Sequence, residues 1–210
     1  MTMFLLIRHA LCDPVGQSIA GRQPGVHLNE AGQIQSRKLA ERLDGLALDA
    51  VYSSPLERAM ETAGPVGQRH HLEVQTALGL NEVDFGEWTG RTLAELEQLP
   101  AWRWFNSFRS GSTIPGGETM AEVLSRSLRE LDRLRERHPD PGALVAVVSH
   151  GDVLRMLVVH ALGMSADLLQ RVELSPASVS LLQIEDHGPR VLLLNSTDGW
   201  PSGVPLRNAF

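Results

Sequence analysis

The chain has 210 residues, of which 42% are hydrophobic and 21% charged, and its formal net charge is -6. This is typical of a globular protein with one substantial core, so we expect a single domain over residues 1–210. The acidic balance and the lack of a basic run argue against a nucleic-acid partner. The first apolar run is too short to span a bilayer, and the lone Cys12 can form no internal disulfide. We therefore expect a cytoplasmic protein without a membrane partner.

Residues 4–7 form a short apolar run that is followed at once by Arg8 and His9. This pattern predicts a buried strand with both polar side chains at its carboxyl end. The following stretch is rich in Gly and Pro and predicts an irregular loop. Asn29 then predicts the N-cap of a helix that runs to about Gly45.

A second strand is predicted over residues 49–53, and the sequence Ser-Pro-Leu-Glu follows at 54–57. That sequence matches a capping box with proline at the first helical position, so it predicts a helix start. Arg58 then falls in the first helical turn, beside the carboxyl edge of the sheet. A weaker strand signal at 72–74 precedes a loop that contains Glu82.

Thr119 and Glu122 form another capping box, which predicts a long helix covering one face of the sheet. An apolar run over residues 143–148 leads into His150 and a further helical pattern. The leucines of the long helix that we expect to be buried, at helical spacing, are Leu124, Leu128, Leu131 and Leu134.

The last strand signals, at 179–182 and 191–194, predict a closing hairpin. Strand and helix signals otherwise alternate along the chain. This alternation predicts an α/β fold, a three-layer αβα sandwich with a mostly parallel sheet and helices on both faces. Residues from about 91 to 118 are expected to form a small cap insertion.

The strands that end at His9 and His150 bring two histidines to one sheet edge, where open α/β sheets bind ligands. One histidine at a strand end is usually structural, but two together with Arg8 indicate a functional site. Arg58 and Glu82 are expected at the same edge. Two cations, two imidazoles and one carboxylate suit transfer of a dianionic phosphoryl group, whose transition state spreads negative charge over its oxygens.

Around these residues the sequence resembles the histidine phosphatase superfamily, which has the phosphoglycerate mutase-like fold. The resemblance depends on the order and completeness of the motifs rather than on any one of them. In chain order they are Leu-Ile-Arg-His at 6–9, Gly-Arg at 21–22, Leu-Asn-Glu-Ala-Gly-Gln at 28–33, Tyr-Ser-Ser-Pro-Leu-Glu-Arg-Ala-Met-Glu-Thr-Ala at 52–63, Glu-Val-Asp-Phe-Gly-Glu-Trp-Thr-Gly at 82–90, Pro-Gly-Gly-Glu at 115–118 and Val-Ser-His-Gly at 148–151.

The resemblance implies that His9, in its neutral form, attacks phosphorus and becomes phosphorylated. Its other ring nitrogen would donate to a fixed acceptor that sets the tautomer. Arg8, Arg58 and His150 would bind the phosphoryl oxygens, and the Gly151 amide at the next helix start would add a donor.

Glu82 would protonate the leaving-group oxygen and then take a proton from the attacking water. That role requires a protonated carboxyl group when substrate binds. Burial and the nearby phosphate would raise the pKa of Glu82, while the arginines oppose this. The alternative for Glu82 is a solvated loop carboxylate.

The first loop departs from the family pattern, which commonly reads Arg-His-Gly-Glu-Thr and has an asparagine shortly afterwards that contacts phosphate. Here residues 10–15 read Ala-Leu-Cys-Asp-Pro-Val, so that contact is missing. Ser18 is the candidate replacement, and Arg22 is a candidate secondary binder. A cysteine-dependent phosphatase would need arginine six positions after Cys12, where Ser18 stands, so we reject that mechanism.

No metal and no cofactor are expected. His70 and His71 are adjacent, and His150 with His160 lacks the helical spacing of a zinc site. The chain also lacks a phosphate-binding glycine loop that ends in Lys-Ser/Thr, which argues against that type of nucleotide hydrolase.

The interval from Gly90 to Pro115 is too short for the insertion with which phosphoglycerate mutases shield the phosphoenzyme from water. Hydrolysis is therefore favoured, and residues 85–91 look most like the α-ribazole phosphatase and broad-specificity phosphatase branches. We predict a metal-independent phosphomonoesterase that acts on a small phosphorylated metabolite, with a homodimer as a possible assembly. Two alternatives stay open: mutase-type phosphoryl transfer, and a non-catalytic member that only binds a phospholigand because its first loop is altered.

Aromatic residues crowd the region between the Glu82 loop and the long helix. The cluster suits either a small core beneath the cap or a lid that stacks on a bulky leaving group. It contains six of the ten aromatic residues, namely Phe85, Trp88, Trp102, Trp104, Phe105 and Phe108.

Overall fold

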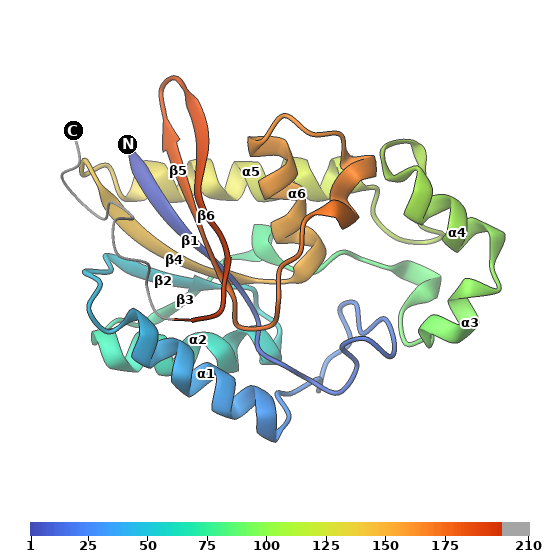
Figure 1. The fold of residues 1–210 in the computed structure, drawn as a ribbon, viewed down its shortest axis with the longest axis horizontal. Coiled ribbons are helices and arrows are strands. Elements are labelled where there is room, and N and C mark those ends of the chain that lie inside the picture. The colour runs from blue at the N-terminus through green and yellow to red at the C-terminus, as the bar shows by residue number, and fades with distance from the viewer. Residues whose placement is uncertain (199–210) are drawn as a thin grey trace.

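The computed structural model describes residues 1–198, which contain a six-stranded sheet (Figure 1). The strands span Thr2–Arg8 (β1), Ala50–Ser53 (β2), Val74–Thr76 (β3), Ala143–Ser149 (β4), Val179–Glu185 (β5) and Gly188–Ser196 (β6). Their order is β3-β2-β4-β1-β5-β6. The pairs β1–β4, β2–β4 and β2–β3 are parallel, whereas β5 is antiparallel to β1 and to β6. The predicted mostly parallel sheet with a closing hairpin is therefore confirmed.

Helices cover both faces of this sheet (Figure 1). The α-helices span Glu30–Leu43 (α1), Glu57–His70 (α2), Leu93–Glu97 (α3), Pro100–Ser107 (α4), Met120–Arg137 (α5) and Gly151–Ala161 (α6). Short 3-10 helices span Leu78–Leu80 (η1), Gly86–Trp88 (η2), Arg109–Gly111 (η3) and Ala166–Arg171 (η4). Among the described residues, no helix is long and apolar enough to cross a membrane.

Side chains of β1 alternate between two hydrophobic clusters, as a central strand requires. Phe4 and Leu6 pack in the cluster that contains α5 and α6, while Leu5 and Ile7 pack in the cluster that contains α1 and α2. These two clusters lie on opposite faces of the sheet. The three-layer αβα sandwich predicted from the sequence is thus the observed architecture.

Side-chain caps mark the starts of three of the six α-helices in the described part of the chain, namely α1, α3 and α5. The Asn29 side chain accepts a hydrogen bond from the Gly32 amide at 2.9 Å and caps α1, as predicted. Thr119 begins α5 with a complete capping box. The buried row of α5 differs from the expected leucines, however, because Leu124 and Leu128 are only partly buried. The core-facing positions are Met120, Val123, Ser127, Leu131 and Leu134.

The capping box predicted at residues 54–57 is wrong. Helix α2 begins at Glu57, and its N-cap Leu56 makes no side-chain cap hydrogen bond. The Ser54 hydroxyl lies instead 2.7 Å from Nε2 of His150, on a neighbouring strand end. A tertiary hydrogen bond has therefore replaced the local cap that the sequence favours.

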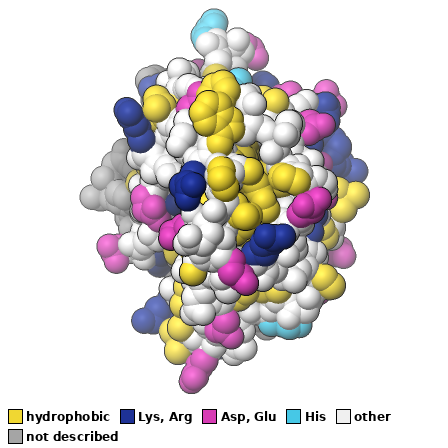
Figure 2. All heavy atoms as spheres, turned by 90° about the vertical axis from the view of Figure 1, so that its right-hand side faces the viewer, with side chains coloured by type: hydrophobic (Ala, Val, Ile, Leu, Met, Phe, Trp, Pro, Cys, Tyr) yellow, Lys and Arg dark blue, Asp and Glu magenta, His cyan; other side chains and the backbone are white. Residues whose placement is uncertain are grey.

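The segment from 91 to 118 forms the end of the molecule that carries α3 and α4 (Figure 1). Figure 2 views the molecule from this end and shows hydrophobic side chains exposed between charged ones. Trp88 and Phe105 are buried in the main core, with ring centroids 5.3 Å apart. Trp104 and Phe108 pack edge to face on the outside, where Trp104 is 60% exposed. The aromatic cluster is thus partly core and partly surface.

Candidate active site

The carboxyl ends of β1 and β4 bring the two predicted histidines together. These strands are paired in register, with Arg8 opposite Ser149, so His9 and His150 leave the sheet at the same edge. Their ring centroids are 5.1 Å apart, and both side chains are buried.

The hydrogen bonding of His9 fixes its tautomer. Nδ1 of the ring lies 2.7 Å from the Ala10 carbonyl oxygen, which can only accept, so Nδ1 carries the proton. Nε2 is then left with its lone pair. Burial, and after it the charge of Arg58, lowers the pKa of His9 to about 3. The imidazole is therefore neutral near pH 7, as a nucleophile must be.

Two guanidinium groups flank this imidazole with unused donors. Arg58 is only 1% exposed; one terminal nitrogen donates to the Gly21 carbonyl at 2.8 Å, and the other has no partner among the described residues. Arg8 donates to the Leu174 carbonyl at 2.6 Å, while its buried Nε is likewise unpaired. Buried donors without a partner are costly, and an anion between the two arginines would satisfy them.

His150 and Gly151 complete this wall. His150 Nδ1 lies 3.7 Å from the Glu82 carboxylate and has no hydrogen-bond partner in the described part of the chain. Burial and the neighbouring His9 hold the pKa of His150 well below its usual value. Gly151 is the first residue of α6, and a Cβ atom there would lie 3.3 Å from Nε of Arg8. A glycine thus leaves the space that the guanidinium fills.

The carboxyl group of Glu82 faces the histidines and is 13% exposed. Burial raises its pKa to about 7, although the charge of Arg58 opposes the shift. The balance that the sequence left open therefore favours a carboxyl group that is substantially protonated near neutral pH. A solvated loop carboxylate would be far more exposed.

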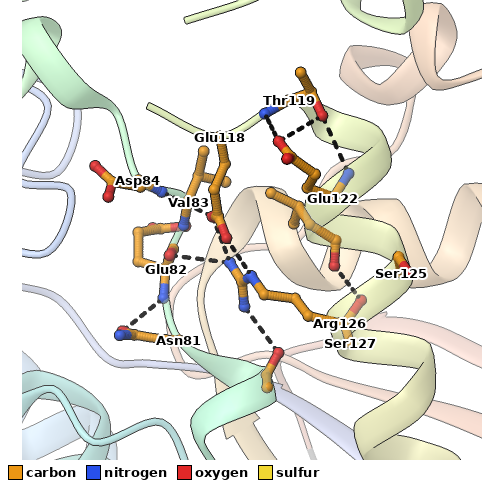
Figure 3. Close-up of polar contacts among 12 residues, drawn as sticks. Asn81, Glu82, Val83, Asp84, Glu118, Thr119, Glu122, Ser125, Arg126 and Ser127 are labelled. Atoms are coloured by element: carbon orange, nitrogen blue, oxygen red, sulfur yellow. Dashed lines mark hydrogen bonds and ion pairs between the residues drawn. The ribbon is translucent and has the colours of Figure 1, made fainter. Parts of the chain in front are cut away.

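A polar network behind Glu82 fixes the backbone of this loop (Figure 3). The Glu82 carbonyl oxygen accepts from Arg126 at 3.0 Å and from Nε of Arg22 at 2.8 Å. Glu118 binds both arginines and accepts from the Asp84 amide at 3.0 Å. These bonds come from α5, the first loop and the segment before α5, so three distant parts of the chain hold the acid loop.

The candidate role of Arg22 as a secondary binder finds no support in the lining of the cavity. Arg22 does not line the cavity beside His9. Its guanidinium is committed to the Glu82 carbonyl, to Glu118 at 2.8 Å and to Asp84 at 3.6 Å. Ser18, by contrast, lies in the cavity wall. Its role as the replacement for the missing asparagine stays a prediction.

The cavity has a volume of about 170 Å³ and is open on one side. Cys12 also lines it, and burial raises the pKa of that thiol, which suits a protonated and unreactive group. Within residues 1–198 no group of three or more His, Cys, Asp and Glu side chains is arranged to hold a metal ion. The lining also includes Arg8, His9, Arg58, Glu82, Phe85, Gly151, Asp152 and Arg155.

Two of these residues, Asp152 and Arg155, were not singled out from the sequence. Asp152 binds Arg155 at 3.2 Å and Arg109, which lies in η3, at 2.8 Å. With 18 arginines and one lysine among its basic residues, the sequence gives little reason to select any one arginine. The position of Arg155 one helical turn after Gly151 was the only available signal.

Comparisons with known proteins identify the family of this chain. The family model for the histidine phosphatase superfamily (branch 1) matches residues 4–197. Phosphoserine phosphatase 1 of Hydrogenobacter thermophilus is 32% identical over 206 residues, which cover 94% of this chain and 93% of that protein. A bifunctional protein of Mycobacterium tuberculosis is 36% identical over 203 residues, or 93% of this chain, but the match covers only 54% of that relative.

Solved structures give the same result. The α-ribazole phosphatase of Shigella flexneri has a TM-score of 0.83 and is 27% identical to this chain. The match covers 96% of this chain and 100% of that structure. A mycobacterial glucosyl-3-phosphoglycerate phosphatase has a TM-score of 0.84 at 25% identity, and the match covers 93% of this chain and 99% of that structure. The resemblance found in the sequence motifs is confirmed. The chain belongs to the histidine phosphatase superfamily, branch 1.

Proposed function

We propose that this protein hydrolyses the phosphomonoester of a small metabolite through a phosphohistidine on His9. The observation that carries the proposal is the bond from Nδ1 of His9 to the Ala10 carbonyl, at 2.7 Å, which leaves Nε2 unprotonated beside two arginines. The names of relatives such as phosphoserine phosphatase 1 and α-ribazole phosphatase support the substrate class.

In the first step, Nε2 of His9 attacks phosphorus and the bond from phosphorus to the ester oxygen breaks. Glu82 gives its proton to that oxygen, so the alcohol leaves neutral. Arg8, Arg58 and His150 bind the phosphoryl oxygens, and the Gly151 amide at the start of α6 adds a donor. The unpaired nitrogens of both arginines suit this task.

In the second step, water attacks phosphorus and the phosphorus–nitrogen bond breaks. Ionised Glu82 takes a proton from the water, and inorganic phosphate leaves. The pKa of Glu82, raised by burial to about 7, suits both halves of this cycle because neither protonation state is costly at neutral pH.

The two alternatives are less well supported. A protein that only binds a phospholigand needs neither a nucleophile with a fixed tautomer nor a carboxyl group with a raised pKa, yet His9 and Glu82 have these properties. A mutase would need to shield the phosphohistidine from water, and the cavity beside His9 is open.

A panel of phosphomonoesters, with phosphate release as the readout, tests the proposal. We expect hydrolysis of a simple aryl phosphate without added metal, and the rate should be unchanged by a chelator. Loss of activity on chelation, or no turnover on the whole panel, would overturn it. Phosphate that appears only on an added acceptor, with no free phosphate, would favour the mutase-type alternative.

A further inference from the structure

The cavity wall holds a third arginine, Arg155, that the steps above do not use. Arg155 lies one turn into α6 and lines the cavity together with Arg8 and Arg58. Helical side chains lean toward the N-terminus of their helix. Its terminal nitrogen accordingly comes within 3.7 Å of the position that a Cβ atom on Gly151 would occupy. The guanidinium groups of Arg8 and Arg155 therefore both face the start of α6.

Fixed partners hold Arg155 in place. Its Nε donates to the Val172 carbonyl at 2.9 Å, and its two terminal nitrogens donate to Asp152 and to Glu173, each at 3.2 Å. A guanidinium group has five N–H donors, so these three bonds leave two donors for a ligand. The adjacent Leu174 carbonyl binds Arg8, so one short segment anchors both arginines.

The charges around Arg155 do not cancel. Asp152, 18% exposed, is the less exposed of its two carboxylate partners, but the same carboxylate also binds Arg109 at 2.8 Å. Although burial would raise the pKa of Asp152, Arg109 and Arg155 hold it below its usual value, so the group is ionised. One carboxylate balances one of the two arginines. The other partner, Glu173, is 67% exposed and strongly screened by water.

A bound phosphoryl group does not account for this extra charge. Its two negative charges match Arg8 and Arg58, which have the unpaired buried nitrogens. Arg155 then remains as a cation at the wall, while Val15, Ile19 and Leu93 give the cavity an apolar part.

From this arrangement we infer that Arg155 binds a carboxylate on the leaving alcohol, so the preferred substrates are phosphate esters of hydroxy acids. The inference rests on the proposed phosphatase function. Arg155 is then a specificity-determining residue, and Asp152 with Arg109 keeps its guanidinium in position. A planar guanidinium can present two N–H donors to a carboxylate, and Arg155 has two donors left, one on each terminal nitrogen.

The test compares 2-phosphoglycolate with its amide, 2-phosphoglycolamide, at pH 7.5. The two esters have nearly the same size and differ in the charge and hydrogen-bonding groups of the distal end. The amide is the more electron-withdrawing, so the intrinsic reactivity of the ester favours the amide. We expect the wild type to show a kcat/KM at least tenfold higher for the carboxylate. Arg155→Met should bring the ratio to within threefold of one, with the amide rate changed less than threefold.

Two further variants control this comparison. Arg155→Lys keeps the charge and should retain part of the preference for the carboxylate. Arg171→Met removes an exposed arginine at the end of η4, outside the cavity, and should leave the ratio unchanged. An equal loss on both esters in Arg155→Met would assign Arg155 to the phosphoryl group or to the fold, and would overturn the inference. A wild type without the preference would do the same.

Binding to His9→Ala separates this inference from the phosphatase proposal, because it requires no turnover. Calorimetry should show the carboxylate bound at least tenfold more tightly than the amide, and the difference should vanish in the His9→Ala/Arg155→Met double variant. If the difference appears while the wild type hydrolyses nothing, the inference stands and the phosphatase proposal fails. If hydrolysis is normal and the difference is absent, only the inference fails.

Discussion

Replacement of Glu82 by glutamine gives a quantitative test of the proposed acid. Because burial raises the pKa of Glu82 to about 7, the protonated fraction falls about tenfold for each pH unit well above that value. Wild-type kcat/KM on an alkyl phosphate should follow this fall. Glutamine keeps the size of the side chain but cannot donate an acidic proton. At pH 6, Glu82→Gln should therefore lower the alkyl rate by roughly 10² to 10⁴.

The leaving group distinguishes this role from a general loss of structure. An activated aryl phosphate leaves readily as an anion, so Glu82→Gln should lower its rate by less than about tenfold. Single-turnover phosphorylation of His9, measured before water attacks, keeps the second step from obscuring the first. Glu87→Gln is the matched control, because Glu87 is an exposed carboxylate in the same loop and does not line the cavity.

Two results would refute the assignment. One is an equal loss on alkyl and aryl esters in Glu82→Gln. The other is an alkaline fall in the alkyl rate that persists in this variant, which would mean that a different group titrates. Asp84 in the same loop would then be the next candidate, although it lies 3.6 Å from Arg22 and accepts from the Gly86 amide.

Arg58→Met should lower kcat/KM by about 10² to 10³ on alkyl and aryl phosphates alike, since its donors would stabilise the transition state whatever the leaving group; a loss confined to alkyl esters would contradict this. Arg126→Met should release the backbone of Glu82 and so lower the rate on alkyl phosphates more than the rate on aryl phosphates. Arg126→Lys should restore part of the alkyl rate. Equal losses on both kinds of ester would make Arg126 purely structural. Gly32→Ala should lower the melting temperature, because its Cβ would lie 2.0 Å from a backbone oxygen.

The features that the sequence predicted well are those encoded locally. The apolar runs that end at His9 and His150 define two strands, and the parallel topology then requires their ends to meet. Asn29 and Thr119 cap their helices because each has its hydrogen-bond partner within three residues. The Ser54 cap failed because His150, which is distant in sequence but adjacent in the sheet, takes the hydroxyl.

The supporting networks could not be predicted in the same way. The Arg22 side chain reaches the Glu82 carbonyl, and Arg126 reaches the same oxygen from α5. Arg109 reaches Asp152 from η3. Each of these contacts depends on how loops and helices pack, and side-chain spacing along the chain carries no trace of it. The pKa of Glu82 was undecidable for the same reason, since burial is a property of the packed loop.

The covalent step is tested most directly by rapid quenching of a single turnover with phosphate-labelled aryl ester. The quench must be alkaline, because phosphohistidine survives base and is lost in acid. The proposed mechanism predicts a base-stable, acid-labile label on His9, formed faster than free phosphate and absent from His9→Ala. A label on Cys12 or His150 would contradict it.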